Sequence, residues 1–442
     1  MALTVKNNMP AQKTLNVLIK TEGTAAKDLK KLATGQKINS AGDDASGYSI
    51  SDKMDVQVRG LDQDNNNTQN AQSLLGTAEG AVQSTVDILR TLKEKVINAA
   101  NDTNTDIDRA TIQKELDQAV DQIDDNANST FNGIQLLDGS HNSEVLVPGT
   151  YTALTNESLS TDTGEFTMLT DLADRTGNSL QIQASDQIIV SYVKQGITYT
   201  SEPFTVGDNM VSQIFDCTKG LNKDNPNGDI GVTYYSSYIG TDQHGNDVST
   251  IDGGNALTYV ATSPGLAGQI SGLTVIVQNR YGQPRTNANA SLNNFQESIR
   301  AQDPSPDNAF VFQIGTKANQ SVKLGLTDMR ATALGLRATD GSTLQIGTQA
   351  QANAAINVLD SALKKALDQQ TELGSVDSRM DYTSSNIVTA SENTTAAMST
   401  IRDADMAAEM TAYTKDNVIA QASQSMLAQA NQNLSQVLSL LQ

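Results

Sequence analysis

Cysteine and histidine are scarce in this chain. Cys217 is the single cysteine, and the two histidines, His141 and His244, lie far apart. One cysteine excludes an intramolecular disulfide. Two distant histidines exclude the His-Glu-x-x-His pattern of a zinc peptidase. They also argue against a hydrolase triad, because most of the many serines and aspartates have no histidine near them in the sequence. We therefore expect no catalytic residue, no cofactor and no metal site, and a protein that is not an enzyme.

Positive charge and long apolar runs are also scarce. The 30 lysines and arginines face 50 aspartates and glutamates, which gives a net charge of −20. Such an acidic chain is repelled by nucleic acid and by anionic membranes, so we expect neither as a partner. No apolar run has membrane-spanning length, and the first residues lack a signal-peptide core and cleavage site. We expect a cytoplasmic protein or an export route that uses no cleaved signal.

Residues 417–442 contain no glycine, no proline and no charge. Their apolar residues recur at spacings of three, four and seven, which predicts an amphipathic helix. The other face carries Gln, Asn and Ser in place of the ion pairs of a helix that faces water, so we predict that it contacts protein or lines a polar passage. The apolar face includes Ile419, Met426, Leu427, Leu434, Val437 and Leu441.

Burial of these apolar side chains does not offset the entropy that is lost when the whole segment becomes ordered. We therefore predict that residues 417–442 are disordered in the free chain and fold by packing against copies of themselves. The alternative is a C-terminal helix that docks on its own domain.

The first 33 residues carry an apolar stripe and a basic one. Lysines recur every seven residues and so share one helix face. These lysines form either a solvated face or a surface that attracts acidic groups of neighbouring subunits. The basic stripe is Lys6, Lys13, Lys20 and Lys27, and the apolar stripe includes Leu15, Leu18, Ile19 and Leu29.

Two long segments repeat apolar residues every seven positions. The residues three places later are mostly small, which is typical of a coiled-coil seam that lets the partner helix approach closely. The segments have similar lengths, so we predict that they pair antiparallel and bring both chain ends together. The predicted coiled-coil core is Met54, Leu61, Leu75, Val82, Leu89 and Val96 with Leu359, Leu373, Met380, Ile387 and Ile401.

Between these segments the composition changes. Prolines and tyrosines concentrate there, and alternating runs such as Ile188 to Tyr192 and Ile197 to Tyr199 predict β-hairpins. We predict an α+β fold, an antiparallel bundle of long helices from both chain ends with an inserted β-rich middle region. The expected domains are 1–42 with 402–442, 43–140 with 309–401 including a short β-hairpin, and 141–308.

Several blocks of the chain resemble bacterial flagellins. The resemblance covers roughly residues 1–140 and 309–442, and the middle matches no pattern that we can name. The longest blocks are LATGQKINSAGDDASGYSISDKM (32–54), SLLGTAEGAV (73–82), FNGIQLLDG (131–139), FQIGTKANQ (312–320), DMRATALGL (328–336), IRDADMAAEM (401–410) and SMLAQANQNLSQVLSLLQ (425–442).

The resemblance implies a subunit that polymerises into the extracellular flagellar filament for swimming. It implies that residues 1–42 and 402–442 form an inner tube around a channel, that the heptad helices form a tube outside it, and that residues 141–308 are variable and exposed to solvent. It also implies export of the unfolded chain through the flagellar type III apparatus. The implied partners are copies of the chain, an export chaperone, and the hook-associated junction and cap proteins. The alternatives are a hook–filament junction protein, or a filament subunit whose middle domain is also an adhesin.

The resemblance also points to an innate-receptor surface. Many flagellins carry Gln-Arg-x-Arg-Glu-Leu-Ala-Val-Gln, which a Toll-like receptor recognises, and residues 90–98 match it only in part. Glu94 is kept, and Glu115 matches a supporting acid on the next helix. Thr91, next to Arg90, replaces an arginine, and Lys95 replaces the leucine. Loss of an arginine anchor commonly costs about 2 kcal/mol or more, so we predict weak receptor activation.

Overall fold

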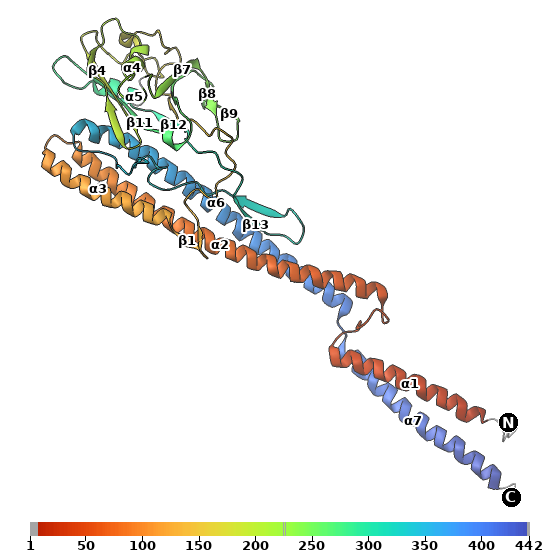
Figure 1. The fold of residues 1–442 in the computed structure, drawn as a ribbon. Coiled ribbons are helices and arrows are strands. Elements are labelled where there is room, and N and C mark those ends of the chain that lie inside the picture. Colours follow the sequence, from red (N-terminus) through yellow and green to blue (C-terminus); the bar gives the residue numbers. More distant parts are fainter. Residues whose placement is uncertain (1–7, 224, 226, 440–442) are drawn as a thin grey trace. The chain divides into compact units, whose positions relative to one another are not determined.

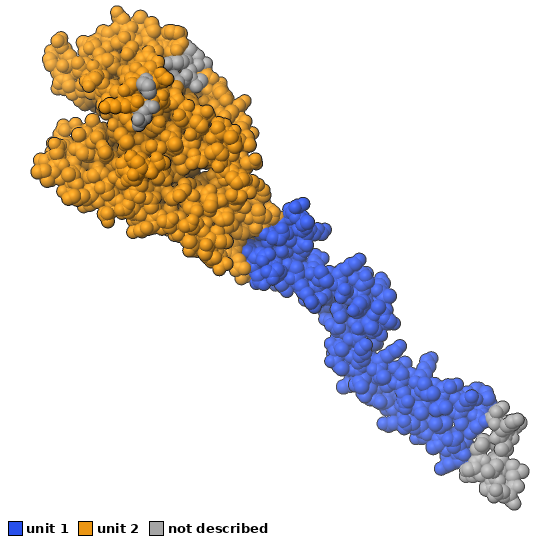
Figure 2. Space-filling view, in the orientation of Figure 1, with its two compact units in different colours: residues 1–68, 313–320, 382–442 blue, residues 69–312, 321–381 orange. Residues whose placement is uncertain are grey.

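The computed structural model describes residues 8–223, 225 and 227–439, without the side chains of residues 232–235 and 434–439. The chain forms two units (Figure 2). Unit 1 comprises the residues up to 68, residues 313–320 and those from 382 onward. Unit 2 comprises residues 69–312 and 321–381. Both units therefore contain segments that are far apart in the sequence.

The terminal helices of unit 1 are α1 (Met9–Thr34) and α7 (Met406–Ser439), which lie side by side and antiparallel (Figure 1). Asn8 caps α1 by accepting a hydrogen bond from the Ala11 amide, and Gly35 ends the helix with a left-handed φ of 70°. The Lys31 ammonium is 3.0 Å from the Glu409 carboxylate, and the Asn8 amide donates to the Ala430 carbonyl at the other end of the pair.

A short backbone pairing joins the segments that follow α1 and precede α7. The Lys37 amide donates to the Arg402 carbonyl at 2.8 Å, and the Ala404 amide donates to the Gly35 carbonyl at 2.9 Å. Asp44 then caps the next helix by accepting from the Ser46 and Gly47 amides. A Cβ at Gly47 would lie 2.6 Å from the Ile38 Cδ1, so a larger residue would require the Ile38 side chain to shift.

The longest helices are α2 (Ala45–Ala99) and α6 (Gln349–Arg402), and the boundary between the units crosses both of them. Within unit 2, hydrogen bonds join Lys93 to Asp360 and Gln83 to Gln370, so the helices run antiparallel. Within unit 1, Asn65 receives a hydrogen bond from Ser384 in the same sense. The third helix of unit 2, α3 (Asp106–Ala127), begins with a capping box formed by Thr105 and Asp108.

Short strands accompany the helices. The pair β1 (Thr130–Phe131) and β2 (Ile134–Gln135) follows α3. The pair β13 (Phe310–Gln313) and β14 (Ser321–Leu324) follows the middle region, and the tip between them belongs to unit 1. A Cβ at Gly60 of α2 would lie 2.7 Å from Thr316 in this tip, so the loop rests directly on the helix backbone.

The middle region of unit 2 contains two four-stranded sheets that share one core. The hairpin of β4 (Gln187–Lys194) and β5 (Ile197–Thr200) turns at Gln195 and Gly196. Their φ values of 50° and 73° are typical of a type I′ turn. One sheet has the order β12 (Gln296–Ile299), β3 (Ala153–Asn156), β10 (Ala256–Ala261) and β7 (Ile230–Ser236). The other has the order β11 (Ile270–Gln278), β4 (Gln187–Lys194) and β5 (Ile197–Thr200), and β6 (Phe204–Thr205) also pairs with β4.

The core between these sheets is apolar. Leu257 and Tyr259 come from one sheet and Val190 and Val275 from the other, and the short helices α4 (Ser212–Asp216) and α5 (Thr286–Leu292) close its edges. Single helical turns at Leu169–Asp171 and Leu266–Gly268 and the hairpin of β8 (Tyr238–Thr241) and β9 (Asp247–Ser249) complete the region. The chain enters and leaves it through paired segments, since Val145 and Ser305 exchange backbone hydrogen bonds.

The predicted α+β fold is confirmed, with antiparallel long helices from both chain ends and an inserted β-rich middle. The predicted hairpin at residues 188–199 is present as β4 and β5. The division into three domains stays a prediction, because the two units follow different boundaries.

Candidate assembly surface

The pair of α1 and α7 buries very little. Among the described residues of these helices, only Leu18, Thr21 and Ser423 are buried. Two of these three side chains are hydroxyls, and Thr21 uses its hydroxyl to bond the Val17 carbonyl of its own helix. Helix pairs in stable domains bury a continuous apolar stripe, so this pair lacks most of the contacts that such helices use.

A row of exposed apolar and small side chains winds along α7. The row includes Met410, Val418 and Met426, which are 56%, 59% and 64% exposed. Residues four apart on a helix form a ridge, and such ridges pack into the grooves of other helices. We call this row the α7 ridge; its members, all exposed, are Met406, Met410, Thr414, Val418, Ala422 and Met426.

A groove runs beside the α7 ridge. Its volume is about 630 Å³, and it is lined by Met410, Val418 and Ile419 together with Ala407, Thr411, Thr414 and Lys415. Ridge and groove therefore occur together on one helix. A like helix from a second copy has the shape to interlock with this surface.

The exposed side of α1 is also partly apolar. Ile19, Leu29 and Leu15 are exposed, as are Met9 and Val17. Lys13, Lys20 and Lys27 of the basic stripe are exposed too, whereas Lys31 pairs with Glu409 of α7. Lys6 lies outside the described residues. Both terminal helices thus present apolar surface that this chain by itself does not cover.

The residues predicted to pack in an inner tube differ in how far the chain buries them. Leu18 is buried, Ile419 and Leu427 are half-buried, and Leu15, Ile19, Leu29 and Met426 are exposed. Leu441 and the side chains of Leu434 and Val437 lie outside the described residues. The structure therefore buries Leu18 within the chain and leaves Leu15, Ile19, Leu29 and Met426 uncovered by it.

Most side chains of the predicted coiled-coil core are buried between the helices. Its end residues, Met54 and Ile401, are half-buried. The buried members are Leu61, Leu75, Val82, Leu89, Val96, Leu359, Leu373, Met380 and Ile387. These side chains hold the chain together and are not available to a partner.

One buried residue of the seam is acidic. Asp64 of α2 is buried, and its Oδ2 has no hydrogen-bond partner among the described residues. Burial raises the pKa of this carboxyl above its ordinary value. The seven-residue spacing with Ala71 and Ala78 places it at a seam position, so the spacing was a signal from which the defect could be predicted.

The residues that resemble the receptor surface lie on α2 and α3 in unit 2. Thr91 and Glu94 are exposed. The Lys95 ammonium is 2.8 Å from the Glu115 carboxylate, and Arg90 pairs with Asp87 at 3.1 Å. Thr91, Lys95 and Glu115 also line a shallow groove between the two helices. Lys95 is therefore paired with Glu115, the acid that the resemblance assigns to receptor binding.

The described residues contain no cluster of His, Cys, Asp and Glu that could hold a metal ion. No helix within that part of the chain is long and apolar enough to cross a membrane.

Comparison with known proteins identifies the family. Residues 5–142 match the bacterial flagellin N-terminal helical region, and residues 356–441 match the bacterial flagellin C-terminal helical region. A flagellin of Clostridium tyrobutyricum is 31% identical over 97% of this chain and 99% of its own length. A flagellin of Bacillus subtilis (strain 168) is 27% identical over 99% of each chain.

Among solved structures, flagellar hook associated protein-3 from Legionella pneumophila covers 79% of this chain and 98% of its own, at 15% identity and a TM-score of 0.33. That likeness is too low to bear on function. The two sequence matches are decisive, because they contain the terminal helices and extend over nearly the whole chain. Flagellins are structural subunits of the extracellular flagellar filament and are not a family of enzymes. The chain belongs to the bacterial flagellin family.

Proposed function

We propose that this chain polymerises into the bacterial flagellar filament and serves swimming motility after its export. The observation that carries the proposal is the exposed apolar surface of α1 and α7, above all the α7 ridge. Burial of apolar surface contributes about 25 cal/mol per Å², so side chains as exposed as Met410 and Val418 favour contact with another subunit. The family and the surface thus support the same role.

The geometry suits lateral packing of helices in a polymer. The α7 ridge of one subunit fits between rows of side chains on a neighbour, as helices do in bundles. The exposed lysines of α1 favour approach to acidic surface in a protein of net charge −20. The terminal helices then gain in the polymer the contacts that they lack in one chain.

The same property supports export in an unfolded state through the flagellar type III apparatus. A helix pair with few buried side chains has little stability to lose when it unfolds. The terminal helices therefore unfold easily for passage through the export apparatus. They become ordered when they pack against a subunit that is already in the polymer.

The proposal is tested by seeded polymerisation. Purified subunits are mixed with filament fragments and observed by electron microscopy, and we expect long extensions from the seeds. Val418→Asp places a charge on the α7 ridge and should stop extension. Ile251→Asp makes the same kind of change at a residue of the middle region that is 95% exposed, and extension should continue.

Failure of the unaltered chain to extend seeds would contradict the proposal and would favour a hook–filament junction protein. Equal extension by the Val418→Asp variant would show that the α7 ridge is not an assembly surface. An adhesin role of the middle region is separate and is tested by binding of the polymer to glycan arrays.

The further partners that we propose are an export chaperone and the hook-associated junction and cap proteins. We also propose that a Toll-like receptor responds weakly, because Thr91 supplies no arginine and Lys95 is paired with Glu115. A reporter-cell assay tests this. Thr91→Arg combined with Lys95→Leu should raise potency about tenfold or more, and full potency of the unaltered protein would contradict the proposal.

A further inference from the structure

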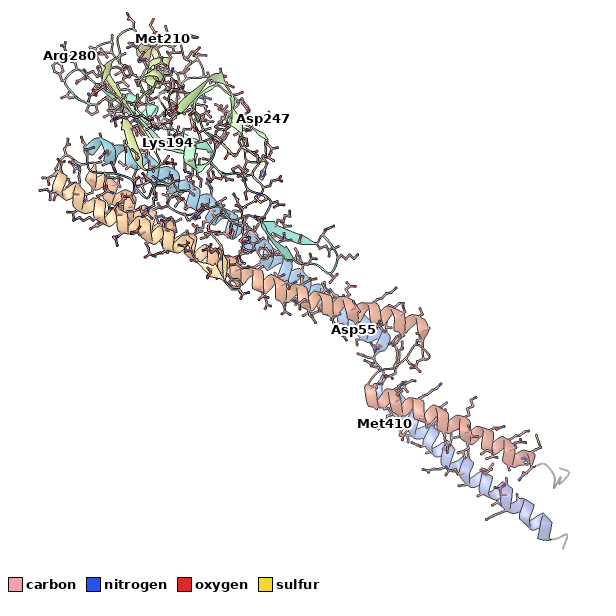
Figure 3. The ribbon with its side chains drawn as sticks, viewed as in Figure 1. Asp55, Lys194, Met210, Asp247, Arg280 and Met410 are labelled. Carbon is pink, nitrogen blue, oxygen red and sulfur yellow. The ribbon has the colours of Figure 1, made fainter. Side chains whose placement is uncertain are left out.

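The α7 ridge is rich in thioether side chains. Of the described methionines, the four most exposed are Met426, Met410, Met9 and Met406, and all four lie on α1 or α7. Figure 3 labels Met410 near the start of α7. By contrast, Met329 and Met380 in unit 2 are fully buried. The sulfur atoms that an oxidant reaches most easily are thus on the assembly surface.

Three of these methionines belong to the α7 ridge. Met406 and Met410 are one helical turn apart, and Met426 lies about four turns further along the row, where the row has wound about 160° round the helix. Methionine suits a surface that must fit several neighbours, because its side chain is unbranched and adaptable. It is also the apolar residue that mild oxidants convert into a polar one.

The reaction is a transfer of one oxygen atom from a peroxide. A lone pair of the sulfur attacks one peroxide oxygen, so that an S–O bond forms as the O–O bond breaks. The proton of the transferred oxygen passes to the leaving oxygen, which departs as water when the peroxide is hydrogen peroxide. The sulfur loses two electrons and the peroxide gains them. The sulfoxide oxygen is a strong hydrogen-bond acceptor, and contact with apolar side chains of a neighbour, such as Val418 and Ile419, offers it no donor.

We propose that Met406, Met410 and Met426 form an oxidation-sensitive site that controls whether a free subunit joins the polymer. Oxidation by a peroxide makes the α7 ridge polar and blocks assembly. Packing in the polymer covers the same side chains and protects them. The inference rests on the proposed function, because it needs the α7 ridge to be an assembly surface.

The test compares oxidised and untreated subunits in the seeded assay. The full chain is treated with hydrogen peroxide, the peroxide is removed, and mass spectrometry of peptides measures the oxygen added at each methionine. We expect oxidation to raise the critical concentration for extension at least about tenfold. Incubation with methionine sulfoxide reductases A and B and a thiol reductant should restore extension.

A matched pair of variants assigns the effect to the α7 ridge. A variant with Met406→Leu, Met410→Leu and Met426→Leu keeps an apolar ridge and should extend seeds before and after peroxide. A variant with Met168→Leu and Met210→Leu removes two exposed methionines of the middle region, 44% and 37% exposed, and should stay sensitive. Loss of extension by the oxidised ridge variant would overturn the proposal.

Two further outcomes separate this proposal from the proposed function. If untreated protein extends seeds and oxidised protein extends them equally, the oxidation site is refuted and the filament role stands. If untreated protein does not extend seeds, both fail. In finished filaments, the three ridge methionines should oxidise at least about tenfold more slowly than Met168, and equal rates would contradict the protection.

Discussion

Two helix pairs in this molecule differ in what they bury. In unit 2 the seam between α2 and α6 contains Val82, Leu89 and Leu373, each completely buried. In unit 1 the pair of α1 and α7 buries Leu18, Thr21 and Ser423 among its described residues and leaves most of its larger apolar side chains exposed. Both pairs are antiparallel and joined by polar contacts. The difference lies in where the apolar residues face.

The comparison teaches that helical sequence and helical stability are separate properties. The unit 2 seam gains its free energy from contacts inside the chain, so this unit folds without neighbours. The terminal pair has helix-forming residues and caps but few such contacts, so its stability depends on what covers the exposed faces. We therefore predict that unit 2 folds by itself and that the terminal helices complete their fold on assembly.

Amide hydrogen exchange gives the largest expected contrast. In the monomer, amides of α1 and α7 should exchange nearly unprotected, whereas those at the centre of the unit 2 seam should open only by global unfolding, at about 5 kcal/mol or more. The measurement is exchange followed by mass spectrometry, with sedimentation to confirm that the protein is monomeric. Slow exchange throughout both terminal helices of a monomer would remove the basis of the comparison.

The same charge should destabilise the two helix pairs to very different extents. Val82→Asp buries an unpaired carboxylate in the seam and should destabilise unit 2 by about 4 kcal/mol or more. Val418→Asp makes the same substitution on the exposed α7 ridge and should change monomer stability by less than about 0.5 kcal/mol. Chemical denaturation of the two monomers measures both values. Similar losses in the two variants would mean that α7 is as tightly packed as the seam.

A buried ion pair ties the middle region to the helices within unit 2. The Lys365 ammonium of α6 is 3.1 Å from the Glu297 carboxylate of β12, and both side chains are buried. Burial lowers the pKa of Lys365, and the Glu297 charge opposes that shift. Lys365→Met leaves the carboxylate unpaired and should cost about 3 kcal/mol in denaturation experiments.

The control for that prediction is the double variant Lys365→Met with Glu297→Leu, which removes both charges. It should recover most of the lost stability, because two apolar side chains of similar size replace the pair. If the double variant is as unstable as the single one, packing at Lys365 and not its charge is responsible.

Substitution of Asp64 should have the smallest effect on stability, and it is the only one of these single changes that should raise it. Asp64→Ala removes a buried carboxylate and matches the alanines at the equivalent seam positions, so it should raise stability at pH 7 by about 1 kcal/mol or more. Asp52→Ala, an exposed change on the same helix, should stay within about 0.5 kcal/mol. Thermal unfolding of both variants measures the difference.

The gain should also depend on pH. The folded-state pKa of Asp64 is raised, so the folded chain favours the protonated form and its penalty grows as the pH rises above the unfolded value of about 3.9. The gain from Asp64→Ala should therefore be larger at pH 7 than near pH 4. A gain that is constant across this range would show that Asp64 does not titrate in the seam.

The helical part of the fold was predictable because its signals are local. The seven-residue spacing of Val82, Leu89 and Leu373 predicts which face is buried, and the Gln195-Gly196 turn predicts the register of β4 and β5. The pairing of β3 with β12 has no such signal, since residues 153–156 and 296–299 are distant and short. The same holds for the contact between Lys365 and Glu297.

The assembly surface was predictable only in outline. The apolar spacing of residues 417–442 indicates an amphipathic helix, but that spacing does not say which apolar residues face α1 and which face outward. Val418 and Ile419 are adjacent, yet Val418 is exposed and Ile419 is half-buried. The row from Met406 to Met426 was visible as a four-residue spacing, and only the position of α1 identifies it as the uncovered side.

The paired segments at Val145 and Ser305 make the middle region a removable module. Their backbone hydrogen bonds of 2.9 Å and 3.2 Å place entry and exit points next to each other. Any folded insert whose ends lie equally close can be grafted there without shifting the register of α2 against α6. The sequence between these two points can thus change in length and fold while the helices that flank it keep their pairing.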